Sequence, residues 1–277
     1  MTIAITGSTG AVGGLVARAL AEDLRTDLRL VVRDAARAPD YDTDVRVCEY
    51  ADGPASVEAL RGVETLFMVS AGEAPDRREQ HRTFIRAAAE AGVGHLVYTS
   101  FAGAAADATF TLGRDHFDAE AAIRESGLAA TVLRDNFYSD LLPWFADDTG
   151  AIRGPAGAGR VAALARADVA DVAVAVLRDP AAHAGAVYEL TGPEALTLAE
   201  VAARAGAVLG RELRFVDETL EEAFASRRAS YPDAQQWQLE AWVSTYTAIA
   251  DGSVATVTGD VERVTGRAAR TIEDALG

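Results

Sequence analysis

Short apolar runs alternate with longer amphipathic segments through the first half of the chain. Each run contains Val, Ile or Leu, as buried parallel strands do. The runs are Thr2–Thr6, Leu28–Val32, Val45–Glu49, Thr65–Val69, His95–Thr99 and Ala130–Leu133. This regular alternation predicts an α/β fold, in which a Rossmann-type, doubly wound parallel sheet carries helices on both faces.

The segments between the runs have the apolar spacing of helices. An Ala-rich run, Leu15–Leu20, follows the first strand. The segment Asp76–Ala91 has apolar residues on one side and arginines on the other, and Gly92 is its stop signal. Asp115–Glu125 has the same character and ends at Gly127. We therefore expect these segments to pack on the sheet through their apolar sides.

The pattern changes after Leu133, where short segments rich in Gly and Pro are more typical of a loop-rich cap. The elements expected beyond it are helices at Asp168–Leu177, Thr197–Leu209 and Pro232–Ala250 and strands at Ala186–Leu190 and Glu212–Val216. We expect a dinucleotide-binding core at residues 1–134 and a smaller, mainly helical substrate-binding part at residues 135–277. Core elements are expected to return within that second part, at about 160–192 and 252–277.

Three glycines spaced three residues apart follow the first strand directly. Gly7 allows a sharp turn, Gly10 leaves room for the backbone to approach a pyrophosphate, and Gly13 lets the next helix pack close to the sheet. The helix then directs its unpaired N–H groups at the phosphates. The alternative is a purely structural strand–helix turn. The predicted pyrophosphate-binding residues are Gly7, Ser8, Thr9, Gly10, Ala11, Val12 and Gly13.

The end of the second strand decides between NADP and NAD in such a site. NAD-binding proteins place an acid there, about twenty residues beyond the last glycine, for the ribose 2′-hydroxyl. This chain has Arg33, whose guanidinium suits a 2′-phosphate, and Arg37 adds positive charge. Asp34, which can bind a free ribose, is the opposing signal. The sequence favours NADPH and leaves NADH possible.

Loops after the third and fourth strands supply further candidates for the cofactor site. Asp52 is placed either to accept a hydrogen bond from the adenine amine or to cap a helix before Ala55. Ser70 and Ala71 follow the fourth strand and by position lie near a cofactor ribose.

Composition narrows the range of functions. The formal net charge of −16 opposes binding to the phosphate backbone of nucleic acid. No apolar stretch reaches membrane-span length, and the chain begins on a strand without the features of a signal peptide, so a cytoplasmic protein is expected. The single cysteine, Cys48, is expected to be a core residue, and His81, His95 and His183 show no metal-site spacing.

Several motifs carry a resemblance to a known family. They are Thr6-Gly-Ser-Thr-Gly-Ala-Val-Gly13, Val31-Val-Arg-Asp34, Tyr98-Thr-Ser100, His116 ahead of Glu120, Leu133-Arg-Asp-Asn-Phe-Tyr138, and the C-terminal stretches 252–260, 264–267 and 271–274. Together they resemble the NmrA-like branch of the atypical short-chain dehydrogenases/reductases, close to NAD(P)H:quinone oxidoreductases and triphenylmethane dye reductases. The resemblance covers nearly the whole chain, and Ser100 joins the expected cofactor residues.

The chain departs from the wider superfamily because all 26 of its basic residues are arginine. Ordinary members use a Tyr-x-x-x-Lys pair as general acid, and without a lysine no tyrosine here acts in that way. Reduction of a simple ketone needs a positioned proton donor. A quinone is less demanding, because its reduction yields a phenolate-like oxygen and phenols have a pKa of about 10. A cationic dye accepts a hydride at carbon and needs no proton.

Substrate residues are expected in the loops beyond the carboxyl ends of the fifth and sixth strands. By resemblance, Asn136 or Tyr138 hydrogen-bonds a substrate oxygen, and aromatic rings stack on a planar acceptor. The candidate rings are Phe101, Phe137 and Trp144. Core packing is the alternative for Phe137, and anchoring of the cap is the alternative for Trp144.

Two residues are candidates for a direct catalytic role, His116 and Tyr138. His116 lies in the helix after the fifth strand and can donate a proton near neutral pH. The alternative for this lone histidine on an amphipathic helix is a structural or solvated position.

Three functions fit these observations. The first is an NADPH-dependent oxidoreductase that transfers a hydride to a quinone or a related planar acceptor. The second is an NmrA-like, NAD(P)-sensing regulatory protein without catalysis, and the third is a pathway-specific reductase or isomerase of a secondary metabolite. The expected partner is a small aromatic or quinone-like molecule. The Trp-bearing helix Pro232–Ala250 is compatible with a monomer or a homodimer.

Overall fold

A parallel sheet forms the centre of the fold. A computed structural model describes residues 1–23 and 27–277 of the chain. Its largest sheet has seven strands in the order β3-β2-β1-β4-β5-β6-β9, and the pairs β1–β2, β1–β4, β2–β3 and β4–β5 are parallel. The strands are β1 Thr2–Thr6, β2 Asp27–Val32, β3 Asp44–Val47, β4 Thr65–Met68, β5 His95–Phe101, β6 Ala129–Asp135 and β9 Val187–Glu189. The predicted Rossmann-type sheet is confirmed.

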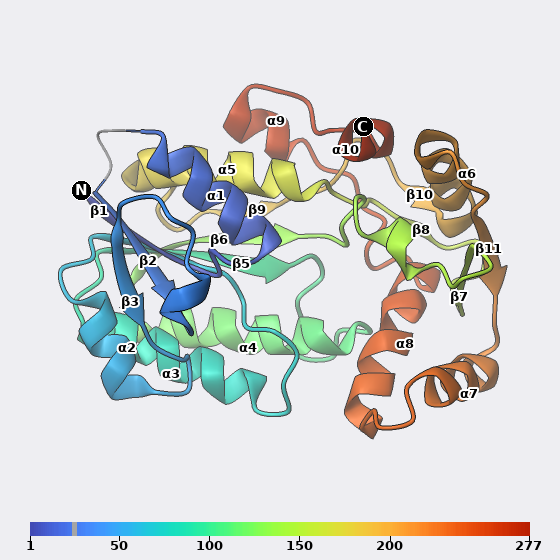
Figure 1. Cartoon of the computed structure of the whole chain (residues 1–277), viewed down its shortest axis with the longest axis horizontal. Helices are drawn as coiled ribbons and strands as arrows, with labels where there is room; N and C mark the ends of the chain where they lie inside the picture. Colours follow the sequence, from blue (N-terminus) through green and yellow to red (C-terminus); the bar gives the residue numbers. More distant parts are fainter. Residues whose placement is uncertain (24–26) are drawn as a thin grey trace. The chain divides into compact units, whose positions relative to one another are not determined.

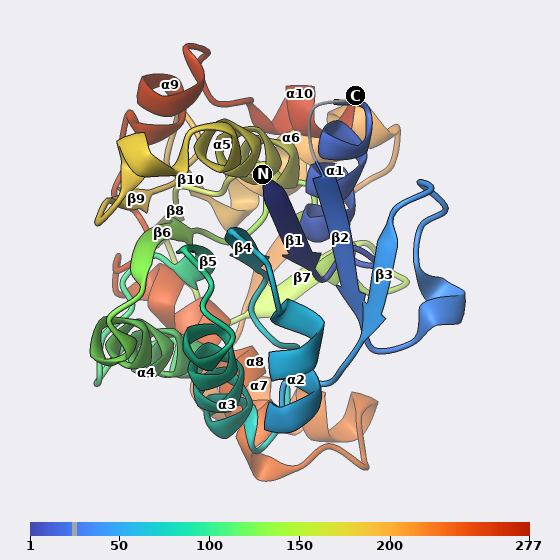
Figure 2. The same ribbon diagram turned by 90° about the vertical axis from the view of Figure 1, so that its left-hand side faces the viewer.

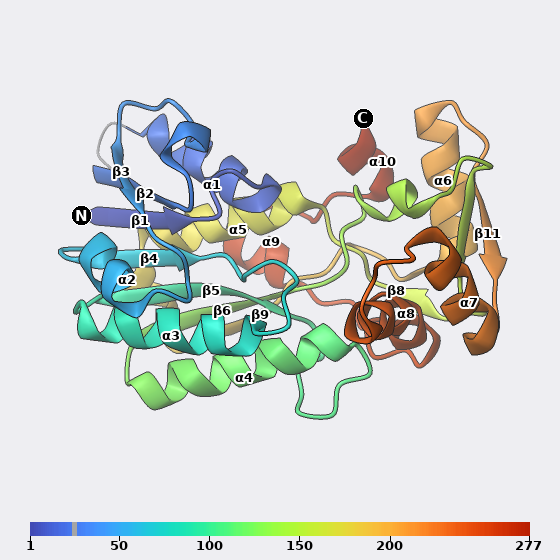
Figure 3. The same ribbon diagram turned by 60° about the horizontal axis from the view of Figure 1, so that its bottom comes forward.

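Helices cover both faces of this sheet (Figures 1 and 2). Helices α1, Ala11–Ala21, and α5, Arg166–Arg178, lie on one face. On the other face lie α2, Gly53–Leu60, α3, Arg77–Glu90, and α4, Thr111–Ser126, and Figure 3 shows α3 and α4 running side by side. Two short 3₁₀ helices, Ala35–Arg37 and Pro180–His183, follow β2 and α5.

The core beneath this second face fixes where the strands end. Leu66 and Met68 of β4, Leu96 of β5, and Phe84 and Ile85 of α3 are all fully buried in one apolar cluster. Because close-packed interiors resist displacement, the loops at the carboxyl ends of β4 and β5 leave the sheet from fixed points. In the order observed, the strand connections reverse direction between β1 and β4, which is where doubly wound sheets bind nucleotides.

The chain divides into two compact units that interrupt each other in sequence. Unit 1 comprises residues Met1–Ser100, Asp115–Arg134 and Val169–Tyr188, and unit 2 comprises Phe101–Arg114, Asp135–Asp168 and Glu189–Gly277. Within the expected returning element at about 160–192, the segment Val169–Tyr188 belongs to unit 1. The segment 252–277, which the sequence assigned to a returning core element, lies in unit 2, and so does 101–114.

Unit 2 contains two small sheets and several helices. Strands β7 and β11 pair in parallel, and β8 and β10 pair in antiparallel fashion. Its core includes Ile152, Val201 and Ile249, all with no exposed surface. The elements are β7 Ala151–Gly154, β8 Arg160–Val161, β10 Leu196–Thr197, α6 Leu198–Leu209, β11 Arg214–Asp217, α7 Leu220–Ser230, α8 Gln236–Ala250, α9 Asp260–Thr265, α10 Ile272–Leu276 and the 3₁₀ helix Leu142–Phe145.

Local signals decide where the helices of unit 2 begin. Thr197 and Glu200 form a capping box at the start of α6, as their spacing predicts. The predicted start of α8 at Pro232 is wrong by four residues, because Gln235 and Gln238 form a capping box and the helix begins at Gln236. Within the described residues, no helix is long and apolar enough to cross a membrane.

Candidate functional site

The turn between β1 and α1 has the backbone geometry that its glycines predict. Gly7 has a φ of +66°, and a Cβ atom there would lie 2.9 Å from Cβ of Val69. A Cβ atom on Gly13 would lie 2.3 Å from the carbonyl oxygen of Gly7, so only glycine lets α1 start this close to the turn. The Gly10 N–H donates to that same carbonyl at 2.9 Å. The turn is therefore tight and internally bonded.

Gly10 differs from the other two glycines because its surroundings are open. Its φ of −100° is accessible to any residue. A Cβ atom there would meet only the Gly7 carbonyl oxygen, at 3.3 Å. Ser8 beside it has a buried hydroxyl oxygen with no hydrogen-bond partner among the described residues. Together with the first N–H groups of α1, this open space and spare hydroxyl fit an anionic group such as a pyrophosphate.

A cavity opens at the carboxyl ends of β1, β2, β3 and β4. Five predicted cofactor residues line it: Gly7, Thr9, Arg33, Ser70 and Ala71. Sequence reasoning missed Glu49, Tyr50, Gly72 and Gln80, which also line it. Glu49 and Tyr50 lie two and three residues beyond the end of β3, so their position after a strand of the nucleotide-binding half was the available signal. Cys48 is buried, as expected, and also reaches this cavity.

Arg33 and Asp34 have different roles after β2. Arg33 is exposed and lies on the cavity wall. The Asp34 carboxylate caps the 3₁₀ helix Ala35–Arg37 by accepting from the Ala36 N–H at 2.9 Å. The acid that opposed the NADP assignment is thus already engaged by the backbone of its own turn, whereas Arg33 is an exposed residue of the cavity wall. Arg37 is exposed in the same short helix.

Two other predicted cofactor residues have structural partners. Asp52 is the N-cap of α2, and its carboxylate accepts from the Ala55 N–H at 3.1 Å, which is one of the two alternatives drawn from sequence. Ser100 is fully buried, and its hydroxyl donates to Glu120 at 2.6 Å. Arg134 holds the other side of the Glu120 carboxylate. The described cavity wall includes neither Asp52 nor Ser100.

Thr6 and Tyr50 join the strand ends around the cavity. The Val69 N–H donates to the Thr6 hydroxyl oxygen at 2.9 Å, and the Tyr50 hydroxyl donates to the Val69 carbonyl at 2.7 Å. The ring of Tyr50 stacks on Phe84 with a centroid distance of 4.1 Å. Burial raises the pKa of Tyr50 above its usual range, so this hydroxyl stays protonated as a donor.

His116 is a buried, neutral residue. Arg77 Nη2 lies 3.0 Å from its Nε2, and the Tyr98 hydroxyl lies 3.0 Å from its Nδ1. Because a guanidinium only donates, Nε2 accepts and the ring is neutral. Burial, then the charge of Arg77, lowers the pKa of His116 well below its usual value. The geometry therefore favours the structural alternative over the predicted proton donor.

Asn136 and Tyr138 are engaged within unit 2. The Asn136 amide donates to the Val254 carbonyl at 3.0 Å and accepts from the Phe137 N–H at 2.8 Å. The Tyr138 hydroxyl donates to Asp135 at 2.5 Å. Burial, then the Asp135 charge, raises the pKa of Tyr138 well above its usual value. A raised pKa makes Tyr138 a poor general acid at neutral pH.

The predicted aromatic residues fall into two groups. Phe101 and Phe137 meet with ring centroids 4.9 Å apart, and Phe110, which sequence reasoning missed, lies 4.7 Å from Phe101 and 5.1 Å from Phe137. Trp144 lies elsewhere, is 57% exposed and has the Arg211 guanidinium 5.7 Å from its ring centroid. Trp144 is thus not a buried anchor of the cap.

Known proteins resemble this chain over almost its full length. The model of the NmrA-like family matches residues 1–272. Quinone oxidoreductase 2 of Escherichia coli is 36% identical over 80% of this chain and 78% of its own length. The NAD(P)H azoreductase of Xenophilus azovorans is 34% identical over 98% of this chain and 96% of its own length. The crystal structure of an NADPH-dependent quinone oxidoreductase of Escherichia coli, complexed with NADPH, has a TM-score of 0.89 and 29% identity, covering 99% of this chain and 98% of that one. The chain therefore belongs to the NmrA-like family.

Proposed function

We propose that this chain is an NADPH-dependent reductase of quinones or related planar electron acceptors, such as azo dyes. The observation that carries the proposal is the cavity that Arg33 lines together with Gly7 and Thr9 of the β1–α1 turn. An arginine in place of the ribose-binding acid suits a 2′-phosphate. The relatives named quinone oxidoreductase and NAD(P)H azoreductase support the same reaction class.

The polar residues of the chain restrict the acceptor. A reduced nicotinamide supplies a hydride, and the product anion must then be protonated or tolerated. The chain has no lysine, His116 is neutral and buried, and the Tyr138 hydroxyl has a raised pKa. An acceptor whose reduced oxygen is phenolate-like needs little help from an acid. Phe101 is buried beside Phe110 and Phe137, which are only partly buried, so Phe110 and Phe137 are the rings proposed to contact a planar molecule of this kind.

The experiment is a two-stage assay of the purified chain. NADPH and NADH are first titrated by fluorescence, and benzoquinone, naphthoquinones and an azo dye are then added while oxidation of the cofactor is followed. We expect NADPH to bind more tightly than NADH and to be consumed with at least one planar acceptor. Saturation with NADPH and no turnover across the panel would overturn the catalytic proposal.

A cofactor sensor is the second candidate, and one observation favours it. The two candidates for a direct catalytic role, His116 and Tyr138, and the substrate-binding candidate Asn136 all have partners within the protein. Such a protein binds the dinucleotide and changes its affinity for another protein without turnover. Tight NADPH binding, no oxidation of any acceptor, and partner capture that depends on the cofactor would favour the sensor.

A further inference from the structure

The segment Val69–Gly72 begins the connection from β4 to α3 and lines the cavity, and side chains on other elements hold its backbone. The Val69 N–H and carbonyl pair with Thr6 and Tyr50. The Ser70 N–H donates to the Thr99 hydroxyl oxygen at 2.8 Å. The backbone of Val69 and Ser70 is therefore fixed by side chains that lie on other elements. The backbone of the next residue, Ala71, is held in the same way.

Two side chains of α3 hold Ala71 from both sides. The Ala71 N–H donates to Nε2 of His81 at 2.8 Å, and Nε of Arg77 donates to the Ala71 carbonyl at 2.8 Å. His81 is fully buried and Arg77 is 4% exposed. We call His81 and Arg77 together the loop clamp.

The loop clamp depends on a neutral His81. Nε2 accepts from a backbone N–H, so the ring proton lies on Nδ1, which has no partner among the described residues. Burial, and then the charge of Arg77 on the same helix, lowers the pKa of His81, so the ring stays neutral. Arg77 is itself fixed by His116 and by Asp115, whose carboxylate lies 3.4 Å from Nη1.

We infer that His81 and Arg77 are positioning residues for the cofactor, acting through the Ala71 backbone without touching the ligand. This inference rests on the proposed function, because it assigns the clamped loop to the dinucleotide. A loop that is already held in its bound shape spends no binding energy on ordering. Loss of the loop clamp is expected to weaken NADPH binding and to leave KM for the electron acceptor unchanged.

The test compares three variants of the full chain. His81→Leu fills the same space but cannot accept the Ala71 hydrogen bond, whereas the amide of His81→Gln can accept it. His95→Leu is the matched control, since His95 is also a buried histidine of unit 1, paired with Thr131 at 2.9 Å rather than with the loop. The readouts are the dissociation constant for NADPH, KM for each substrate, thermal stability and hydrogen exchange of the Ala71 amide.

We expect His81→Leu to raise the dissociation constant and KM for NADPH by about 5- to 10-fold, the value of one lost hydrogen bond, with KM for the quinone unchanged. The Ala71 amide should exchange faster in that variant, His81→Gln should restore most of the affinity, and His95→Leu should lose stability only. Unchanged NADPH affinity in His81→Leu, beside normal binding by the wild type, would overturn the inference alone. Absence of NADPH binding by the wild type would overturn the proposed function and with it the role of the loop.

Discussion

Two loops that follow strands of the same sheet, one after β4 and one after β6, are built in opposite ways. In the loop after β4, other elements supply the side chains that hold the backbone, and the loop itself faces the cavity. In the loop after β6, the side chains of Asn136 and Tyr138 donate hydrogen bonds to Val254 and Asp135. The first loop therefore lines the cavity, whereas in the second the side chains predicted to bind substrate make hydrogen bonds within the protein. A polar residue at a strand end is therefore weak evidence of catalysis by itself.

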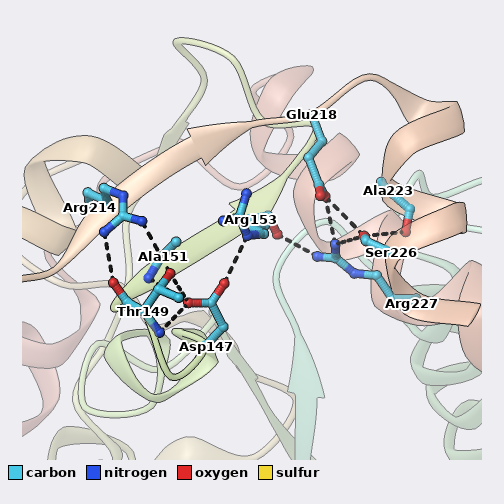
Figure 4. Close-up of polar contacts among 9 residues, drawn as sticks. All are labelled: Asp147, Thr149, Ala151, Arg153, Arg214, Glu218, Ala223, Ser226 and Arg227. Atoms are coloured by element: carbon cyan, nitrogen blue, oxygen red, sulfur yellow. Dashed lines mark hydrogen bonds and ion pairs between the residues drawn. The ribbon is translucent and has the colours of Figure 1, made fainter. Parts of the chain in front are cut away.

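The two units also differ in the chemistry of their polar contacts. All four histidines lie in unit 1, and three of them are buried there, namely His81, His95 and His116. Arginine–carboxylate contacts occur in both units, and unit 2, which has no histidine, has the cluster that Figure 4 shows for β7, β11 and α7. In that cluster Arg153 bonds Asp147 at 2.8 Å and Arg227 bonds Glu218 at 2.7 Å. The units should consequently respond to pH in different ranges.

Acidification is expected to cause the largest loss of stability among the changes considered, and unit 1 should lose stability at a higher pH than unit 2. The folded pKa of His81 is about 3, below its ordinary value of 6.5, and those of His95 and His116 are also lowered. Below pH 6.5 the unfolded chain binds protons that the folded chain does not, so stability falls as pH falls. In unit 2, the Arg204 contact lowers the pKa of Glu273 from 4.5 to about 2, so its contribution is lost only below pH 4.5.

Hydrogen exchange followed by mass spectrometry between pH 7 and pH 4, corrected for intrinsic rates, measures this order. Peptides of unit 1 should lose protection at higher pH than peptides of unit 2. Simultaneous loss in both units, or earlier loss in unit 2, would contradict the comparison.

Gly10→Val should abolish dinucleotide binding while the fold persists. The backbone at Gly10 is extended and its added Cβ meets only one protein atom, at 3.3 Å, so the lost space is the ligand's. We expect affinity to fall by more than about 100-fold in calorimetry, well beyond the loss of one hydrogen bond. Gly259→Val is the matched control, because Gly259 is also a helix N-cap and has open surroundings. Retained binding in Gly10→Val would contradict the assignment of the turn.

Arg33→Ala should weaken the binding of NADPH by about 1.5–3 kcal/mol, the value of hydrogen bonds to a charged group. The binding of NADH should stay nearly unchanged. Parallel fluorescence titrations with both cofactors measure the difference. Arg46→Ala is the control, since Arg46 is half-exposed on β3 and pairs with Asp44 at 3.0 Å. Equal losses for the two cofactors would show that Arg33 does not read the 2′-phosphate.

Asn136→Ala has the smallest expected consequence for catalysis. It removes the bonds to Val254 and Phe137, so we expect a loss of about 1–3 kcal/mol in the free energy of unfolding, because buried backbone groups are left unpaired. Chemical denaturation measures that loss, and KM for the quinone should stay within about 2-fold, since a shift of that size is below one hydrogen bond. A large rise in KM for the quinone with unchanged stability would show that Asn136 contributes to substrate binding.

The sheet and the turn that borders the cavity were predictable from sequence because their determinants are local. A strand is marked by its own apolar residues, and the turn by Gly7 and Gly13, whose neighbours leave no room for a Cβ. The parallel strand order then brings Arg33 and Ser70 to one cavity.

The substrate side was less predictable because its partners are remote. Asn136 makes a hydrogen bond to Val254, 118 residues away, and no local sequence pattern predicts that contact. Helix α7 was missed since it buries only Ala223 and so lacks a clear apolar side. Phe110 lies in a connection without periodicity, and only the fold brings it to Phe101.

The central claim is that the β1–α1 turn and Arg33 together form an NADPH site. Isothermal titration of the unmodified chain with NADPH and with NADH, at matched ionic strength, tests it most directly. We expect one saturable site that binds NADPH at least about 10-fold more tightly than NADH, because charged hydrogen bonds to a 2′-phosphate are available only to NADPH. No heat with either cofactor, or tighter binding of NADH, would contradict it.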